Sequence, residues 1–537
     1  MLRVEGLGKH AFRAGNTLPG SVGKRLLRAS FTATTLSRAA SGALWLAAAC
    51  NDDTVIVGKL PRPSMPDAGR SESGVDAASV GAAGSQPPRD ASLAVAPPVP
   101  RLDRTPYTVA IETSSYSELC NGSGSVLTSV RADGSASPCE ARVERRVFGY
   151  GLCACEALQI EGESFLIDSF DSSAGAYTAG ETGGNVGLAG TRMTLAHDTQ
   201  ILGSLSIAGD GVLPLAAASL VVSGDLKSNA ALQVRGGMQR IVRDLWAGSD
   251  VVVSAGSLRV EGDAYQASQH TGLDALSIGG VRHQSELEVP EPCRCDAAAP
   301  IAVDALVAQA SEQHDNAAAS FDPSALAVGS LVTDAHVLPC GRLYGTSLTL
   351  DGPSTFVWMA MGRTALFLQG DLRVAESSTL MVGAPLSGEL DLFVAGNIEV
   401  AASATLSLGA STRPAAMRVF VGGEINAQGS IQLAAQLYAP NATFSTAANT
   451  VDLDQFGAIY ARSIQLVNDR FHYDRAILHT GPACVASQPV SCASCYECPE
   501  ELACTAGTCQ PCESDSDCCE PTVCTAGKCR PLVSSWP

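Results

Sequence analysis

The chain carries few charged and few aromatic side chains for its length. Of its 537 residues, 17% are charged and 5% are aromatic, whereas an average domain is ~25% charged. The net charge is −19. Nucleic-acid binding by the whole chain is excluded, because phosphate contacts need clustered lysine and arginine. Beyond the leader, no apolar run reaches the ~18 residues that a membrane-spanning helix needs.

Motifs of the common enzyme and metal classes are also missing. The sequence contains no HExxH pair, Gly-x-Ser-x-Gly elbow, Walker loop, dinucleotide fingerprint or EF-hand loop. We therefore predict that the protein is not an enzyme and holds neither a metal nor another cofactor.

Glycine and cysteine are abundant, with 52 and 19 residues. Many glycines beside few charges and rings favour stacked, turn-rich β structure over helical bundles. So many cysteines indicate an exported, oxidised protein. The length suggests three or four domains at ~150 residues each, unless the chain is a repeat protein.

The N-terminus has the layout of a secretory signal, a basic region followed by the short apolar run 39–49. Residues 46–50 resemble a bacterial lipobox. The resemblance implies cleavage after residue 49 and a diacylglycerol on the Cys50 thiol, which would anchor the chain in a membrane. The alternative is ordinary signal cleavage with an unmodified Cys50. Residues 50–106 contain nine prolines and are predicted to form a disordered tether.

From residue 195 onward, short β-like runs end in Gly-Asp or a variant, followed by an apolar residue. The pairs occur at Gly203-Ser204, Gly224-Asp225, Arg243-Asp244 and Gly262-Asp263, then at Gly370-Asp371, Gly396-Asn397 and Gly423-Glu424. Glycine is expected to turn the chain with positive φ, and Asp or Asn to bond its own backbone at the corner. A period of 20–27 residues is the signature of a solenoid.

We predict a mainly β fold, a parallel β-helix of the right-handed type in two blocks. A β-sandwich or propeller is the alternative. An insertion between the blocks contains a helix with Val303, Leu306, Val307 and Ala310 on one apolar face, capped by Asp296 with Pro300 in its first turn. This helix is expected to cover the solenoid between the blocks. The predicted boundaries are 1–49 signal peptide, 50–106 tether, 107–194 cysteine-containing cap region, 195–266 first block, 267–345 insertion, 346–478 second block and 484–530 cysteine-rich module.

Two passages resemble a known β-helical domain. Residues 167–177 (IDSFDSSAGAY) are similar to the segment that opens this domain in certain bacterial secreted and pilus-assembly-associated proteins. Residues 456–464 with 471–474 (FHYD) are similar to the way it closes. The family commonly has proline before the tyrosine of the opening segment, where this chain has Ala176. The resemblance covers roughly 150–478 and implies envelope or surface structure rather than a reaction.

Leaving Cys50 aside, 18 cysteines remain, and all are predicted to form disulfides. Seven lie in the body and eleven from Cys484 onward, so two odd counts require at least one bridge between the regions. Neither CxC pair, 153/155 or 293/295, can readily close on itself, which favours bridges between the pairs or to other body cysteines. A redox pair is the functional alternative. The candidates are Cys120, Cys139, Cys153, Cys155, Cys293, Cys295, Cys340, Cys484, Cys492, Cys495, Cys498, Cys504, Cys509, Cys512, Cys518, Cys519, Cys524 and Cys529.

The C-terminal region is a tandem duplication. A C-x5-C-x5-C-x4-C unit that begins at Cys492 recurs with the same spacing from Cys512. A stretch this short and polar can bury only a small core, and disulfides must therefore hold it together. It resembles small knottin-like or Dickkopf-like modules. An iron–sulfur or zinc site is the alternative for its closely spaced cysteines. The export signal argues against the iron–sulfur cluster.

Parallel β-helices often bind or cut polysaccharides with carboxylates on one face, and such chemistry needs two carboxyls ~5–10 Å apart. The candidates are Asp168, Asp171, Asp225, Asp263 and Asp371. Turn chemistry alone explains the aspartates at the repeated corners. His472 and Asp474 lie on one face of a strand, where a structural hydrogen bond is favoured over a catalytic dyad.

The expected function is that of a surface-exposed, envelope-anchored lipoprotein with a non-catalytic adhesive or scaffold role, facing the periplasm or the cell exterior. Its expected partners are the membrane, through the lipid, and a polysaccharide or an envelope protein. The acidic C-terminal module would contact another protein or a basic surface. One alternative is a polysaccharide-processing enzyme, which ring-stacking residues along one face would favour. The other is a self-polymerising, bactofilin-like scaffold, which needs uncapped solenoid ends.

Overall fold

The computed structural model describes residues 108–130, 143–267, 275–284, 288–295, 301–328, 333–384, 387–449 and 453–480, and short stretches between 502 and 531. The predicted signal peptide and tether lie outside these ranges, as do Cys50, Cys139 and Cys484.

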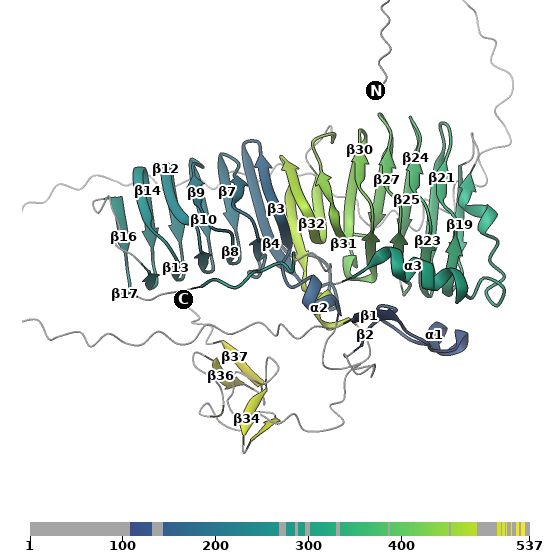
Figure 1. The fold of residues 1–537 in the computed structure, drawn as a ribbon, viewed down its shortest axis with the longest axis horizontal. Helices are drawn as coiled ribbons and strands as arrows, with labels where there is room; N and C mark the ends of the chain where they lie inside the picture. The colour runs from purple at the N-terminus through teal and green to yellow at the C-terminus, as the bar shows by residue number, and fades with distance from the viewer. Residues whose placement is uncertain are drawn as a thin grey trace, which may run out of the picture. The chain divides into compact units, whose positions relative to one another are not determined.

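A parallel β-solenoid of about 11 turns forms the body, which confirms the predicted fold class (Figure 1). We call strands β3–β17 the first arm and strands β18–β33 the second arm. The first arm comprises β3 (Leu152–Glu161), β4 (Ser164–Phe170), β5 (Val186–Leu188), β6 (Arg192–Thr194), β7 (Asp198–Ile201), β8 (Leu205–Ile207), β9 (Val212–Leu215), β10 (Ser219–Val222), β11 (Leu226–Ser228), β12 (Ala231–Ile241), β13 (Leu245–Ala247), β14 (Val251–Val260), β15 (Ala264–Gln266), β16 (Leu276–Ile278) and β17 (Arg282–Gln284). The second arm comprises β18 (Ala327–Val328), β19 (Thr333–Leu338), β20 (Gly341–Gly345), β21 (Leu348–Leu350), β22 (Thr355–Ala360), β23 (Arg363–Leu368), β24 (Leu372–Val374), β25 (Thr379–Gly383), β26 (Glu389–Val394), β27 (Ile398–Val400), β28 (Thr405–Gly409), β29 (Met417–Val421), β30 (Ile425–Ala427), β31 (Ser430–Ser445), β32 (Asp454–Val467) and β33 (Arg470–Asp474), with the short 3-10 helix η3 (Pro414–Ala416) before β29.

The repeat steps seen in the sequence are the stacking steps of the rungs. Leu226 is paired with Leu205 and with Leu245, which in turn pairs with Ala264. In the second arm, Leu372 pairs with Ile398, and Ile398 with Ile425. These columns point inward and form one buried core that runs through both arms. Burying each such leucine or isoleucine side chain contributes ~1.5–3 kcal/mol of stability. A single rung could not bury them, because the rungs above and below provide the cover.

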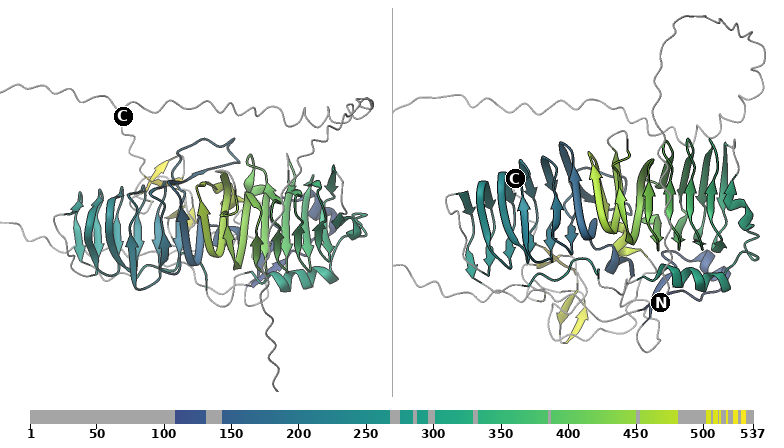
Figure 2. Two further views of the ribbon diagram at one scale, coloured as in Figure 1. Left: turned by 90° about the horizontal axis from the view of Figure 1, so that it is seen from above. Right: turned by 45° about the horizontal axis from the view of Figure 1, so that its top comes forward.

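The two arms are stacked in an order that differs from the order of the chain. The first rung, β3 and β4, lies in the middle of the solenoid, and the first arm grows away from it on one side. On the other side, β3 pairs with β32 and β4 with β33, the last rung of the second arm. The chain therefore returns to stack on its own beginning, and the blue and yellow-green strands lie side by side in both views of Figure 2.

Residues 285–326, the return segment, connect the far end of the first arm to the far end of the second. Its described part pairs with Asn229, whose side chain bonds both the backbone N–H and the carbonyl of Val289. It then passes β3 and continues as helix α3 (Val303–Glu312), which packs on β20, β23 and β26. The 3-10 helix η2 (Pro323–Leu326) completes it.

The predicted helix in the insertion is confirmed, with Val303, Leu306, Val307 and Ala310 all buried. Three details of that prediction were wrong. The helix begins at Val303 with no side-chain cap, so Asp296 is not its N-cap and Pro300 is not in its first turn. It covers the flank of the second arm rather than a gap between blocks, because the arms are in direct contact through β3 and β32.

Several predicted boundaries also differ from the structure. Residues 152–194, assigned to a cap region, supply the rung at the centre of the solenoid and part of the next one. The insertion prediction of 267–345 includes the terminal rungs of both arms, β16–β17 and β18–β20. These rungs lack the Gly-Asp corner by which the repeat was recognised.

The chain before the solenoid lies along the flank of the second arm. It contains β1 (Thr108–Ile111), α1 (Tyr116–Asn121), β2 (Leu127–Val130) and α2 (Val143–Val147). The hairpin β1–β2 and the two helices form a second apolar cluster with α3 and with the 3-10 helix η4 (Arg475–His479) that follows β33. The described solenoid thus begins and ends at neighbouring places, since α2 packs against η4.

The described stretches of the C-terminal module form two antiparallel hairpins. The strands are β34 (Ala503–Thr505) with β35 (Thr508–Gln510), and β36 (Thr522–Thr525) with β37 (Lys528–Pro531). Cys504 is opposite Cys509 in the first, and Cys524 is opposite Cys529 in the second. The tandem repeat of the sequence is therefore a repeated hairpin.

Candidate functional site at the junction of the two arms

The corner aspartates stack in ladders and bond the backbone of the next rung. Asp225 accepts the N–H of Asp244, and Asp244 accepts the N–H of Asp263 at 2.8 Å. Asp263 accepts the N–H of Val281 at 2.7 Å. In the second arm Asp371 accepts the N–H of Asn397 at 2.8 Å. The expected bond from each aspartate to its own corner is corrected here, because Asp225, Asp263 and Asp371 each accept a backbone N–H of the following rung.

Glycine is needed before each corner residue, but not for the positive φ that the sequence suggested. Gly224, Gly262 and Gly396 do not have positive φ. Instead, a Cβ at Gly262 would collide with a side-chain oxygen of Asp244, and one at Gly396 with an oxygen of Asp371. Glycine leaves the space in which the carboxylate of the preceding rung reaches the next backbone N–H.

The other two carboxylate candidates belong to the opening segment. Asp171 accepts the backbone N–H of Ser173 at 2.9 Å in a local turn. Asp168 is fully buried, and it accepts bonds from the Tyr177 hydroxyl at 2.8 Å and from the Gly180 N–H at 3.0 Å. All five candidates therefore hold the backbone or neighbouring side chains in place.

His472 joins the closing segment of the solenoid to this opening segment. Its Nδ1 lies 2.6 Å from Asp168, and its Nε2 lies 3.6 Å from Asp454. The His472 ring packs against those of Tyr177 and Phe456, at centroid distances of 4.1 and 4.8 Å, and these two rings also contact each other at 5.7 Å. The predicted structural hydrogen bond of His472 is thus present, but its partner is Asp168 rather than the nearby Asp474.

The ionisable groups at this junction shift one another's pKa values. Burial by itself lowers the pKa of His472, but the hydrogen bonds and negative charges of Asp168 and Asp454 outweigh it and raise the pKa above its ordinary value. The bond to His472 lowers the pKa of Asp454, assisted by Arg470. Burial and the bond to Asp168 raise the pKa of the Tyr177 hydroxyl. His472 lies within 2.6 Å of Asp168 and 3.6 Å of Asp454, so this one ring connects the first rung to the last.

Asp474 makes a second link across the junction. Its carboxylate accepts the N–H and hydroxyl of Ser172, the N–H of Ala415 and the N–H of Ala476. Burial raises its pKa against the effect of these bonds. The opening segment 167–177 and the closing segment 471–474 are therefore the two halves of one contact.

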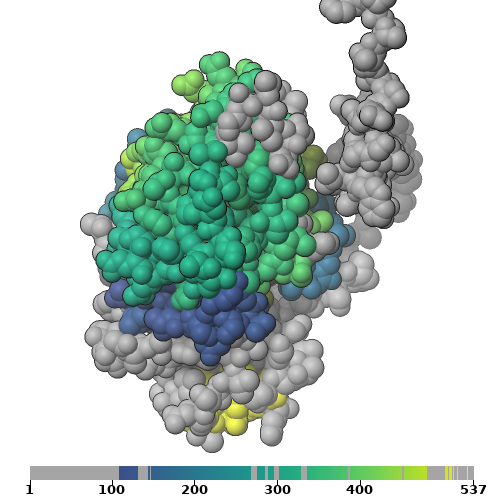
Figure 3. All heavy atoms as spheres, turned by 90° about the vertical axis from the view of Figure 1, so that its right-hand side faces the viewer, coloured from purple at the N-terminus to yellow at the C-terminus, as the bar shows by residue number. Residues whose placement is uncertain are grey.

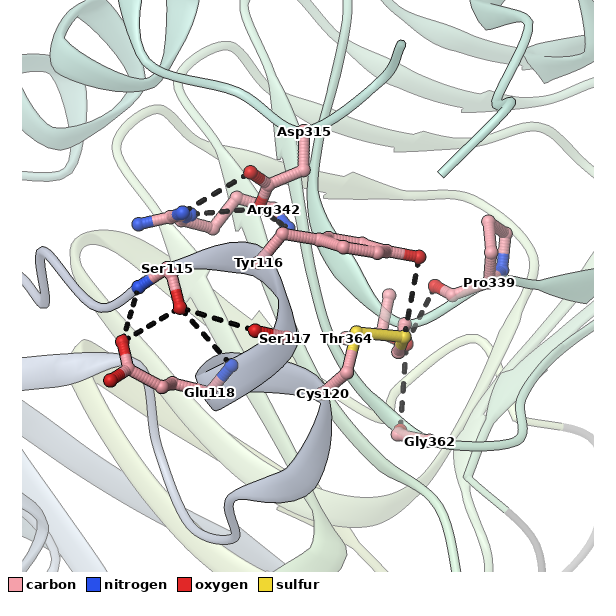
Figure 4. Close-up of a disulfide and its surroundings, with 11 residues drawn as sticks. Ser115, Tyr116, Ser117, Glu118, Cys120, Asp315, Pro339, Arg342, Gly362 and Thr364 are labelled. Atoms are coloured by element: carbon pink, nitrogen blue, oxygen red, sulfur yellow. Dashed lines mark hydrogen bonds and ion pairs between the residues drawn. A yellow bond between two sulfur atoms is a disulfide. The ribbon is translucent and has the colours of Figure 1, made fainter. Parts of the chain in front are cut away.

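Three disulfides reinforce the same closure. Cys153 bonds Cys293 and Cys155 bonds Cys295, so the two CxC pairs cross-link β3 to the return segment. Cys120 bonds Cys340, which ties α1 to the start of β20 (Figure 4). The predicted bridging between the CxC pairs is confirmed. Six of the seven body cysteines are paired, and the seventh, Cys139, lies outside the described residues.

In the C-terminal module, Cys504, Cys509, Cys512 and Cys529 are disulfide-bonded. The remaining predicted cysteines there, apart from Cys524 in β36, lie outside the described residues: Cys484, Cys492, Cys495, Cys498, Cys518 and Cys519. In the part of the chain that the structure describes, no group of three or more metal-ligating side chains is close enough to hold an ion.

A buried polar cluster attaches the N-terminal hairpin to the second arm, and sequence reasoning missed it. Arg363 binds Glu112 with two bonds of 2.7 and 3.0 Å. Arg418 is fully buried and bonds Asp391, which also accepts the N–H of Val126 at 2.7 Å. Apart from Arg418 and Asp391 on adjacent strands, these partners are far apart in the chain. No local spacing could have revealed them.

A column of stacked side chains on the outer face of the first arm was also missed. Trp246 and Tyr265 stack at 4.0 Å and Tyr265 and His283 at 4.5 Å, with nearly parallel planes. Lys227 lies over the Trp246 ring at 5.7 Å and pairs with Asp225. The signal was available in the sequence, because all four residues stand two positions after a corner or its equivalent.

Comparison with known proteins assigns no activity. Residues 290–480 match a family described as a domain of unknown function (DUF7305). No curated protein and no solved structure matches the chain. The matched region is the return segment with the second arm and η4. Its cysteines 293, 295 and 340 all bond residues outside it, and its last strand pairs with β4.

Among the described residues, no helix is long and apolar enough to cross a membrane.

Proposed function

We propose that this protein is an envelope-anchored lipoprotein, exposed at a surface, whose solenoid serves as a non-catalytic scaffold or adhesive platform. The lipid on Cys50 and the tether hold it at the membrane, and the solenoid presents its outer faces to a polysaccharide or an envelope protein.

The observation that carries this proposal is the use made of the candidate carboxylates. A polysaccharide-cleaving enzyme of the two-carboxylate kind needs carboxyl groups that are free to exchange protons with a substrate. Asp168 is buried beneath Tyr177 and bonded to His472, and Asp371 is bonded to Asn397 and Arg373. Side chains used in this way favour a rigid support over a reaction.

In this proposal the chain enters and leaves the solenoid along its flank. Helix α2 packs against η4 beside the central rung, and α1 packs on β20 and β23 along the flank of the second arm. Both connections, to the tether and to the cysteine-rich module, therefore leave from the flank. In this proposal the outer face of the first arm is the surface offered to partners.

A carbohydrate-binding role has one observation in its favour, the column of Trp246, Tyr265 and His283 beside the aspartate ladder. The rings are stacked on one another, so their edges rather than their faces point outward. This geometry supports binding along the ladder more than it supports a catalytic groove.

The test uses the oxidised, exported chain with a panel of bacterial and plant polysaccharides, with binding and chain cleavage read from the same samples. Binding without cleavage, or neither, agrees with the proposal. Cleavage that an Asp168→Asn or Asp371→Asn substitution abolishes would contradict it. A Trp246→Ala variant separates the ladder from other surfaces, because only ladder binding should be lost.

A further inference from the structure

Two disulfides lie side by side between β3 and the return segment. Cys153 bonds Cys293 and Cys155 bonds Cys295, so one residue separates the two bridges on each side. Either bridge alone would join the same two parts of the chain, with a sequence separation of 140. Once one bridge is formed, the other closes only a small ring and constrains the unfolded chain much less. Attachment of the return segment therefore explains one bridge better than two.

The two bridges differ in burial. In the inner bridge, Cys153 is 2% exposed and Cys293 is 1% exposed. In the outer bridge, Cys155 and Cys295 are both partly exposed. Cys155 also lies at the break in register between β3 and β32, where the strand pairing is interrupted. Because thiol–disulfide exchange requires a thiolate to reach one of the two sulfurs, the outer bridge is the more accessible to it.

The Tyr460 hydroxyl contacts both sulfurs of the outer bridge. Its oxygen lies 3.8 Å from Sγ of Cys155 and 3.8 Å from Sγ of Cys295, and it donates a hydrogen bond to the carbonyl of Arg294. When a disulfide is opened by exchange, one of its sulfurs leaves as a thiolate. A charged acceptor binds a hydroxyl donor more strongly than a neutral carbonyl does. The Tyr460 hydroxyl is therefore placed to stabilise whichever sulfur leaves.

Opening the outer bridge would leave the return segment attached. The inner bridge remains, and the Asn229 side chain still bonds both backbone groups of Val289. The Tyr438 hydroxyl accepts the backbone N–H of Ile301 further along the return segment. The outer bridge can thus open and close while the fold around it is retained.

The remaining disulfide of the body, Cys120–Cys340, has a different place. It fastens α1, which packs on β20 and β23, and no second described bridge lies beside it. Figure 3 shows the dark-blue N-terminal elements against the green second arm and α3. Opening this bridge would remove a covalent attachment that no neighbouring bridge replaces.

We propose that the outer bridge is a thiol-exchange site, at which a dithiol of another protein reduces Cys155–Cys295 while the inner bridge stays closed. A thiolate of the dithiol attacks one sulfur, the S–S bond breaks, and a mixed disulfide forms as the other sulfur leaves as a thiolate beside Tyr460. The second thiolate of the dithiol then attacks the mixed disulfide and departs in an intramolecular disulfide. Two electrons and two protons pass from the dithiol to the chain, which keeps two thiols. This inference does not depend on the proposed scaffold or adhesive role.

The test treats the oxidised full chain, without denaturant, with dithiothreitol as the dithiol. Thiols are alkylated at intervals and identified by peptide mass spectrometry. We expect Cys155 and Cys295 to be alkylated at least about tenfold faster than Cys153 and Cys293, because access limits the exchange. Equal rates would overturn the proposal. So would alkylation that occurs only when the chain unfolds, and so would earlier opening of the bridge at α1.

Tyr460→Phe tests the hydroxyl and should slow the opening of the outer bridge by about threefold or more, since the leaving thiolate loses a donor. Tyr438→Phe is the matched control. Tyr438 pairs with Tyr460 on the adjacent strand, and its hydroxyl also bonds the return segment, at Ile301. This variant should leave the rate unchanged. If the two variants changed the rate equally, or if Tyr460→Phe did not slow it, the role given to Tyr460 would be wrong.

Single replacements give a second readout that needs no reductant. Cys295→Ser leaves the thiol of Cys155 free and retains the inner bridge, whereas Cys293→Ser leaves the thiol of Cys153 free and retains the outer one. Each folded variant is incubated with oxidised glutathione, and the mixed disulfide is located by peptide mapping. The Cys155 thiol should form it at least about tenfold faster than the Cys153 thiol. A Cys155 thiol that is no more reactive than that of Cys153 would contradict the proposal.

Discussion

His472 Nδ1 lies 2.6 Å from a carboxylate oxygen of Asp168, a residue 304 positions earlier in the chain. This contact joins the last rung of the second arm to the first rung of the first arm. Both side chains are buried, so water cannot readily take the place of either hydrogen-bond partner. Their contact therefore helps to hold the two arms together.

Replacing His472 by glutamine should destabilise the protein by about 3 kcal/mol, because it leaves a buried carboxylate without its charged partner. Asp168→Asn should have an effect of similar size. Chemical unfolding measures both. His197→Gln is the control, since His197 is 63% exposed beside Asp198 and should change stability by less than about 0.5 kcal/mol. If the His472 and His197 substitutions changed the free energy of unfolding equally, the junction contact would not contribute more to stability than a surface pair.

The same contact makes stability depend on pH. Asp168 and Asp454 raise the folded pKa of His472. The other groups at this junction are the Tyr177 hydroxyl, which bonds Asp168, and Arg470, which pairs with Asp454. A raised histidine pKa contributes stability that is fully present below the ordinary value of about 6.5 and is lost as pH rises through the folded pKa. Wild type should therefore lose stability relative to His472→Gln over that range. A constant difference between the two unfolding free energies at all pH values would refute the charged state of His472.

The corner aspartates should tolerate asparagine but not alanine. Asn at position 371 keeps an oxygen for the N–H of Asn397, whereas Ala leaves that N–H without its side-chain acceptor and should cost ~1 kcal/mol. The natural ladder already contains this replacement, because Asn397 bonds Glu424 in the same way. Thermal unfolding of Asp371→Asn and Asp371→Ala distinguishes the two. If both variants lost the same stability, the carboxylate charge rather than the backbone bond would matter.

Peptide mapping without reduction should find three pairs in the body: Cys120 with Cys340, Cys153 with Cys293, and Cys155 with Cys295. Removing the Cys153–Cys293 bridge with two serines should cost ~2–5 kcal/mol, since it ties positions 140 residues apart. Recovery of a 153–295 peptide would contradict the register of the return segment. Free thiols at Cys504 or Cys529 in exported protein would contradict the disulfide-held C-terminal module.

The sequence predicted the solenoid because its corners repeat locally. Gly224-Asp225 and Gly396-Asn397 mark corners of this repeat, and the glycine of each pair lies against the corner of the preceding rung. The helix at Val303 was predictable for the same reason, since its apolar face follows helical spacing.

The closure was not predictable from spacing. Asp168 and His472 were both singled out, one as a carboxylate candidate and one as a strand histidine, but nothing local connects two positions so distant in the chain. Arg363 and Glu112 are a similar case, as is the crossing of the two CxC pairs, which spacing left open among several partners. Pairing between distant rungs depends on how the whole chain stacks, and it therefore appears only in the folded structure.

Display at the envelope depends most directly on the proposed lipid anchor at Cys50. The decisive measurement is fractionation of cells that express the full chain or its Cys50→Ser variant, with protease accessibility of the solenoid on intact cells. We expect the full chain to be found with membranes and to be cleaved from outside, and the variant to be soluble. A Cys50→Ser protein that still sediments with membranes would contradict the lipid anchor, and a full chain protected in intact cells would contradict surface exposure.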